Sequence, residues 1–374
     1  MEQEQLVLKK EEQAAFAMRA LFEQYGYRRF EMSKFEEYDF YAENRSFLGS
    51  EHILTFNGLD GKLLALKPDV TLSIVKNTKG SRDAADRVYY NENVYRARKG
   101  DGEYREILQA GLEYIGEADG YAVLEVLLLA VKSLELINSE HLLDISHVGF
   151  VAGLVDEAGL NFRNRKRVLR CIREKNGHEI RSICAEAGVP EDLVKRLETL
   201  AGLYGRLNDM LPAARALVVN EKTERAYKEL AQIGGYLKEC GYHDRIHLDF
   251  SIINDMDYYN GVTFQGFVSG IPSSILSGGR YDNLVRKLGK NADAIGFAVY
   301  LDLLERFGSV KKEYDTDVLL LYDPSGDPAD VAKAAERIIA GGESVTVRRE
   351  DFGDIRYRRR IDMRKERTGD QWKE

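Results

Sequence analysis

The chain has 374 residues, of which 44% are hydrophobic and 31% charged, a balance typical of globular proteins. Its net charge of −8 disfavours wholesale nucleic-acid binding, its N-terminus shows no secretory signal, and no stretch has the roughly 18 apolar residues of a membrane span. Cys171, Cys184 and Cys240 form no CxxC pair, and His243 and His247 flank a predicted helix-to-strand change. We therefore expect a cytoplasmic protein without a metal site.

The N-terminal part predicts a helix followed by extended chain. Apolar residues from Ala14 to Tyr25 recur at helical spacing, and Gly26 stands where a C-terminal cap is expected. Residues 27–37 read as extended chain. Residues 53–56 and 62–66 are strand-like on either side of an Asp-Gly turn, which predicts a hairpin.

The middle of the chain changes from strands to helices. Val88–Tyr90 and Gly111–Ile115 predict two further strands, and an apolar helix follows from about 121 to 137. From about 155 to 242 the strand pattern disappears and amphipathic helices dominate. We interpret this segment as a helical insertion.

Strands return after the insertion. Residues 247–253 alternate between apolar and polar, and Val262–Val268 follows the Asn260-Gly261 turn signal as a predicted partner strand. A long helix is predicted to begin near Ala294.

The C-terminal part predicts one β-α-β unit, with strands at 318–322 and 345–347 and a helix at 328–340. The rest is heavily charged and has no apolar period, so we expect a loosely ordered tail. The predicted domains are thus a core at 1–309, a β-α-β unit at 310–350 and a charged tail at 351–374.

Three segments carry candidate binding residues. The first is Leu66–Thr71, where Asp69 and Thr71 could accept hydrogen bonds from an ammonium group at a strand end. The alternative is a surface turn with a helix N-cap, because Pro-Asp-x-Thr is common there.

The second segment runs from Val94–Arg96 through Tyr104–Tyr114 and includes the predicted strand at Gly111–Ile115. Gln109 and Glu113 lie four residues apart, so along a strand both side chains point to the same face.

The third segment comprises the strings 253–261 and 276–282, which contain Tyr259 and Tyr281. The Gly278-Gly279 pair would let backbone approach a ligand closely. The alternative is two aromatic-rich core strands with a glycine bulge.

Together these segments resemble the class II aminoacyl-tRNA synthetases, and specifically the histidyl enzyme, over about residues 8–308. The resemblance implies an α+β fold, with an antiparallel sheet flanked by helices. It implies that Arg96 is an anion-binding residue, because its counterpart grips the α-phosphate of ATP. The residues that it assigns to histidine binding are Asp69, Thr71, Gln109, Glu113, Tyr259 and Tyr281.

The departures from the synthetase pattern fall on the ATP side. Asn254 and Leu303 stand where the synthetases have phosphate-binding arginines, and Glu103 replaces a loop arginine. Ala97-Arg98 replaces the stretch with the ATP-side glutamate. Arg306 lies three residues beyond Leu303, which stands at the position of the arginine in the synthetases' motif 3 helix. Losing one preorganised donor of this kind costs on the order of 10²–10³ in rate, so adenylation is not expected.

This combination is similar to the regulatory subunits of ATP phosphoribosyltransferase, a paralogous family without aminoacylation activity or a full anticodon domain. The similarity implies a subunit with no catalytic residue or cofactor of its own. It would form a homodimer within a hetero-octamer, activate the short catalytic subunit in the first step of histidine biosynthesis, and contribute to feedback inhibition by L-histidine. Ser33 replaces the usual motif 1 proline, which bears on the dimer interface.

Two alternatives remain at this stage. One is a divergent, active histidyl-tRNA synthetase. The other is a synthetase-like module that binds RNA through the basic residues Arg356 and Arg358–Arg360. Because these are interspersed with Asp354 and Asp362, a solvated tail is the preferred interpretation.

Overall fold

The computed structural model describes residues 8–48, 52–97, 103–253, 258–304 and 313–364. The chain divides into two compact units, residues 1–308 and 309–374. Elements of the first unit, in chain order, are α2 (Lys10–Gln24), β1 (Arg28–Arg29), β2 (Phe35–Glu37), α3 (Tyr38–Glu43), η1 (Arg45–Phe47), β3 (Thr55–Asn57), β4 (Leu63–Leu66), α4 (Thr71–Asn77), β5 (Asp86–Ala97), β6 (Tyr104–Gly116), α5 (Gly120–Ile137), β7 (His141–His147), α6 (Val148–Glu157), α7 (Phe162–Arg173), α8 (Gly177–Glu186), α9 (Glu191–Gly202), β8 (Tyr204–Arg206), α10 (Leu207–Ala216), α11 (Glu221–Glu239), η2 (His243–Arg245), β9 (Ile246–Asp249), β10 (Val262–Val268), β11 (Leu276–Arg280), α12 (Asp282–Lys287) and β12 (Asp293–Tyr300).

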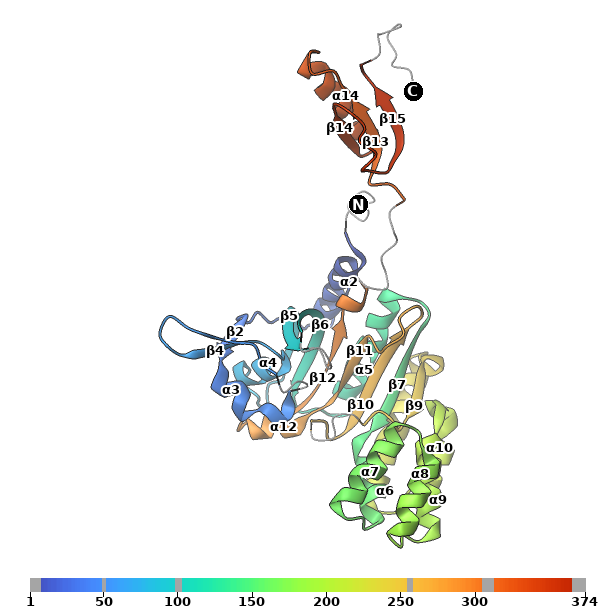
Figure 1. Cartoon of the computed structure of the whole chain (residues 1–374). Coiled ribbons are helices and arrows are strands. Elements are labelled where there is room, and N and C mark those ends of the chain that lie inside the picture. Colours follow the sequence, from blue (N-terminus) through green and yellow to red (C-terminus); the bar gives the residue numbers. More distant parts are fainter. Residues whose placement is uncertain (1–7, 49–51, 98–102, 254–257, 305–312, 365–374) are drawn as a thin grey trace. The chain divides into compact units, whose positions relative to one another are not determined.

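A nine-stranded sheet in the order β1-β5-β6-β12-β11-β10-β7-β9-β8 forms the centre of the first unit. The pairs β1–β5 and β7–β9 are parallel, and the other neighbours are antiparallel. Helices α2 and α5 pack on one face, where Phe22, Leu112 and Phe297 join a large apolar core (Figure 1). The opposite face is partly covered by α3, α4 and α12, and it carries the candidate site.

The predicted hairpin is confirmed, since β3 and β4 pair antiparallel with Phe56 opposite Leu64. The predicted helices at 14–25 and 121–137 correspond to α2 and α5, and Gly26 has the positive φ of 80° that the cap requires. No described helix is both long and apolar enough to cross a lipid bilayer.

Helices α7 to α11 lie within the predicted helical insertion, but that segment is not free of strands. The short strand β8 pairs antiparallel with β9 and extends the sheet by one strand. With only three residues, β8 shows no detectable alternation in the sequence, and its pairing depends on the tertiary position of β9.

Two other expectations are wrong. The strands β9 and β10 do not pair, because β7 lies between them and bonds to both. The long helix predicted near Ala294 is instead strand β12, and helical residues begin only at 302. A continuous apolar run fits a buried strand as well as a buried helix, so periodicity could not distinguish them.

The second unit contains β13 (Thr316–Leu321), α14 (Pro328–Ala340), β14 (Val345–Arg348) and β15 (Tyr357–Asp362), with strand order β14-β13-β15. Strand β15 corrects the expectation of a loosely ordered tail for residues 357–362. It pairs parallel with β13, and Arg359 donates a hydrogen bond to Glu343 at 2.6 Å. Composition hides this strand because its charged side chains find partners outside the local sequence. Residues 365–374 lie outside the described residues.

Candidate amino-acid site

Four strands place one row of residues on the face of the sheet that α3, α4 and α12 partly cover. Glu113 of β6 stands opposite Gly296 of β12, which stands opposite Gly279 of β11, which stands opposite Thr263 of β10. Residues paired across antiparallel strands point to the same face. The two glycines leave room for the side chains of Glu113 and Tyr259. A Cβ on Gly296 would lie 2.6 Å from Glu113 Cδ, and a Cβ on Gly279 would lie 2.7 Å from the ring of Tyr259.

The carboxyl group of Glu113 is the centre of the site. Thr71 Oγ1 donates to Glu113 Oε1 at 2.8 Å, and Tyr281 OH donates to Oε2 at 2.6 Å. Burial raises the pKa of Glu113 to about 8, against the effect of these two hydrogen bonds, and nearby Asp69 raises it further. A ligand cation or N–H donor beside this carboxyl would favour its ionised form.

Asp69 lies at the turn before α4. One carboxylate oxygen accepts from the N–H of Leu72 at 2.9 Å, and the other lies 3.4 Å from Nη2 of Arg96. The N-cap-type contact of the alternative reading is therefore present, yet the second oxygen faces a charged partner. Burial raises the pKa of Asp69, and Arg96 opposes this effect. Arg96 Nε also donates to the carbonyl of Pro68 at 2.7 Å, which ties this candidate anion-binding residue to the same turn.

Tyrosine rings surround the carboxyl group. The ring of Tyr258 packs edge-on against Tyr259, with centroids 4.7 Å apart, and contacts Tyr281 at 5.7 Å. Tyr258 and Tyr90 were not among the predicted site residues. Adjacent tyrosines at 258 and 259 were a signal that either ring could face the site. Tyr90 could have been found from its place opposite Gly111 on the paired strand, where its hydroxyl fills the space of a missing side chain.

A cavity of about 220 Å³ adjoins the ring of Tyr259. Tyr259, Gln265, Ser277 and Tyr300 are among its lining residues, and the hydroxyls of Ser277 and Tyr300 lie 2.8 Å apart. Gln109 is buried and stands opposite Tyr300, so it shares this face with Glu113. The structure thus brings Thr71, Glu113 and Tyr281 into contact, and it places Asp69, Gln109 and Tyr259 around them.

The described ATP-side positions carry no new cation. Leu303 packs against the apolar core, and Glu103 is an exposed carboxylate where the synthetases have an arginine. Asn254, Arg98 and Arg306 lie outside the described residues.

Sequence comparison shows which family this chain belongs to. The family model described as histidyl-tRNA synthetase matches residues 6–304. The ATP phosphoribosyltransferase regulatory subunit of Geobacter metallireducens is 31% identical over 359 residues, which cover 92% of this chain and 82% of that protein. The one from Oceanobacillus iheyensis is 30% identical, with coverage of 81% and 76%. This chain belongs to the ATP phosphoribosyltransferase regulatory subunits. Members of that family are regulatory, and catalysis resides on the partner subunit, so the divergent synthetase and the RNA-binding module are not favoured.

Solved structures agree on the fold. A Bacillus halodurans protein, described as an ATP phosphoribosyltransferase regulatory subunit/histidyl-tRNA synthetase, has a TM-score of 0.73 and 26% identity, covering 94% of this chain and 93% of that one. A chain of the Thermotoga maritima HisG:HisZ complex has a TM-score of 0.62 at 18% identity, covering 78% and 97%, and shows the fold alone. The predicted class II synthetase-like α+β fold is confirmed.

Proposed function

We propose that this regulatory subunit binds L-histidine at the Glu113 site and transmits the occupancy of that site to a short-form catalytic subunit. The observation that carries the proposal is a buried carboxyl held by Thr71 and Tyr281, with Asp69 at the adjacent turn. In this arrangement Glu113 accepts a hydrogen bond from an imidazole N–H, while Asp69 and Thr71 accept from the α-ammonium. Tyr259 and Tyr281 provide aromatic walls, and Gln109 a further polar contact.

The same geometry supports binding without adenylation. Adenylate formation develops charge on phosphate oxygens, which must be neutralised by fixed cations. Leu303 provides none, and Arg96 is already engaged by Asp69 and Pro68. This geometry supports a subunit that keeps histidine binding without ATP chemistry.

The proposed assembly is a homodimer of this chain within a hetero-octamer, with the short catalytic subunit, in the cytoplasm. Support comes from the family and from the Thermotoga maritima structure, whose description names a complex of two different subunits. Histidine can regulate such a complex only if its affinity differs between an active and an inactive arrangement.

The test combines this full-length chain with a short catalytic subunit. We expect the chain to raise phosphoribosyl-ATP formation, L-histidine to reverse this activation, and histidine-dependent ATP–pyrophosphate exchange to be undetectable. Glu113→Gln should abolish the histidine response but keep the activation. The control is Glu106→Gln, an exposed residue of the same strand on the opposite face. If Glu113→Gln left histidine inhibition unchanged, the Glu113 site would not be the sensor.

A further inference from the structure

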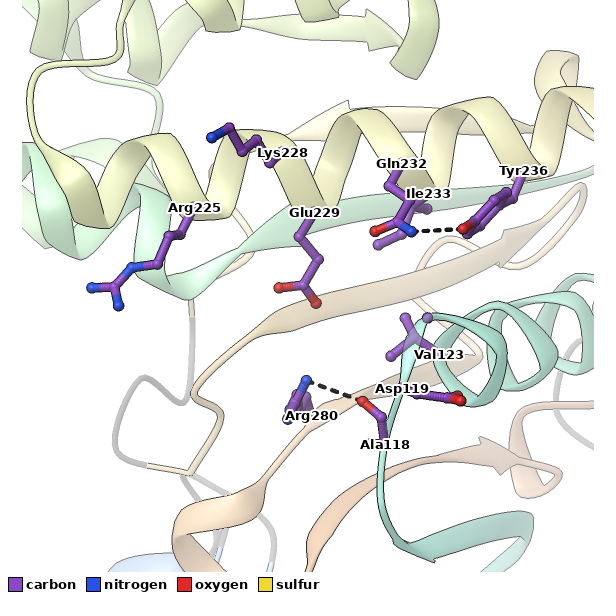
Figure 2. Close-up of a pocket in the computed structure, with 11 residues that line it drawn as sticks. Ala118, Asp119, Val123, Arg225, Lys228, Glu229, Gln232, Ile233, Tyr236 and Arg280 are labelled. Carbon is purple, nitrogen blue, oxygen red and sulfur yellow. Dashed lines mark hydrogen bonds between the residues drawn. The ribbon is translucent and has the colours of Figure 1, made fainter.

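A second cavity, of about 340 Å³, lies between the N-terminal end of α5 and one face of α11. It shares no lining residue with the cavity beside Tyr259. Its size falls within the range of small-molecule sites. Val123 and Ile233 give it an apolar wall, while Arg225, Glu229 and Arg280 bring charge to it (Figure 2).

Glu229 lines this cavity with a partly exposed side chain. Its Oε2 lies 3.0 Å from His147 Nε2, whereas Oε1 is buried and has no hydrogen-bond partner among the described residues. Burial would raise the pKa of Glu229, but the hydrogen bond with His147 and the charges of His147 and Arg280 lower it overall. Glu229 is therefore an ionised carboxylate at neutral pH. A ligand cation in the cavity would stabilise the charge of this partly exposed carboxylate.

Arg280 does not donate to Glu229 Oε1, although Figure 2 shows the Glu229 side chain extending toward it. The guanidinium of Arg280 is engaged elsewhere. Its Nε donates to Asp282 at 2.9 Å, Nη2 lies 3.4 Å from Asp293, and Nη1 donates to the carbonyl of Ala118 at 3.4 Å.

The cavity also has a cationic end. Arg225 lies one helical turn before Glu229 on the same face of α11, about 6 Å along the axis. It is exposed, and no hydrogen bond or ion pair joins it to the described part of the chain. Lys228 adds a second positive charge, although it also lies 3.5 Å from Glu224.

These charges select among ligand classes. A simple anion would meet the carboxylates of Glu229 and Asp119, which both line the cavity. A simple cation would meet Arg225, Lys228 and Arg280. Only a ligand with both charges places each one beside its complement.

We infer that this cavity binds a small zwitterion. Its ammonium lies against the Glu229 carboxylate, its carboxylate lies against Arg225, and its methylenes contact Val123 and Ile233. This site is independent of the proposed histidine site, because the two share no residue.

The test is methyl NMR on the full-length chain labelled at Ile and Val methyls. The probes are glycine, β-alanine, 4-aminobutyrate and 5-aminovalerate, which vary the separation of the two charges, with butyrate and butylamine as single-charge controls. Ile233 and Val123 report on this cavity, whereas Ile252 and Ile253 line the other. The Ile233 and Val123 methyls report on this cavity whether or not a probe also enters the histidine site, which a separate histidine titration tests through Ile252 and Ile253.

We expect at least one ω-amino acid to shift the Ile233 and Val123 methyls in a saturable way, about tenfold more tightly than butyrate or butylamine. Glu229→Gln and Arg225→Gln should each weaken that binding by about tenfold. Lys238→Gln, on the same helix but outside the cavity, should not change it. Arg225 is exposed, so its variant tests the site even if Glu229→Gln fails to fold. The inference is overturned if no probe shifts these methyls, if butyrate or butylamine binds as tightly as the best zwitterion, or if Arg225→Gln has no effect.

Discussion

Replacing Gly296 with alanine places one methyl group against the carboxyl of Glu113. The new Cβ would lie 2.6 Å from Glu113 Cδ, closer still to Oε2, and 2.5 Å from the carbonyl oxygen of Leu112. Ordinary carbon contacts need about 3.5 Å or more, so the carboxyl must move by about 1 Å. That movement breaks its hydrogen bonds with Thr71 and Tyr281, which are 2.8 and 2.6 Å long.

The cost can be worked from these contacts. Two hydrogen bonds at about 1–1.5 kcal/mol each sum to about 2–3 kcal/mol, which corresponds to a loss of about 30- to 150-fold in histidine affinity. Separately, crowding against the Leu112 carbonyl should lower the free energy of unfolding by about 1–3 kcal/mol. Isothermal titration calorimetry with L-histidine measures the first effect, and urea denaturation measures the second.

The matched control is Gly235→Ala. Gly235 lies within α11, and a Cβ there meets nothing within 4 Å. Alanine should stabilise that helix by about 0.5–1 kcal/mol and leave histidine affinity unchanged. If Gly296→Ala bound histidine as tightly as the unaltered chain, Glu113 would not form the wall of a histidine site.

Three further predictions concern the same unit. The pKa of Glu113 is near 8 in the folded chain and near 4.5 without its surroundings, so the unfolded state binds fewer protons between these pH values. The free energy of unfolding should therefore fall as pH rises from 4.5 to 8. Urea denaturation at several pH values should show a smaller fall for Glu113→Gln, and an equal fall would exclude this residue as the cause. Tyr281→Phe removes the donor to Glu113 and should weaken histidine binding by about tenfold in calorimetry, whereas unchanged affinity would show that this hydrogen bond does not support the ligand. Glu92→Gln leaves the buried Lys67 ammonium without its ion pair and should lower the free energy of unfolding by about 3–5 kcal/mol. Glu37→Gln removes an exposed ion pair with Lys62 and should cost less than about 1 kcal/mol. Similar losses for the two variants in urea denaturation would contradict this account of burial.

The sequence predicted more of the helices than of the strand pairing. Helices α2 and α5 follow from apolar periodicity, and the β3–β4 hairpin follows from its turn residues. Strand β12 was mistaken for a helix because it is apolar throughout. Strand β15 was missed because its residues are mostly charged, and β9 was given the wrong neighbour.

The sequence by itself determined the local features of the site. Strand alternation placed Gln109 and Glu113 on one face, and the turn at Asp69 and the paired glycines were visible as motifs. Periodicity and turn chemistry act over a few residues, so they can be read without a fold.

Only the tertiary structure decided which of these residues meet. Glu113 bonds to Thr71 and Tyr281, which are 42 and 168 residues away, because β6 and β12 pair in one register and leave Gly296 beside the carboxyl. The cavity at Glu229 arises in the same way, since the residues that line it come from the start of α5, from α11 and from β11, which are far apart in the sequence. Such contacts depend on strand order and on what each helix buries, and these are properties of the whole folded chain rather than of any short segment.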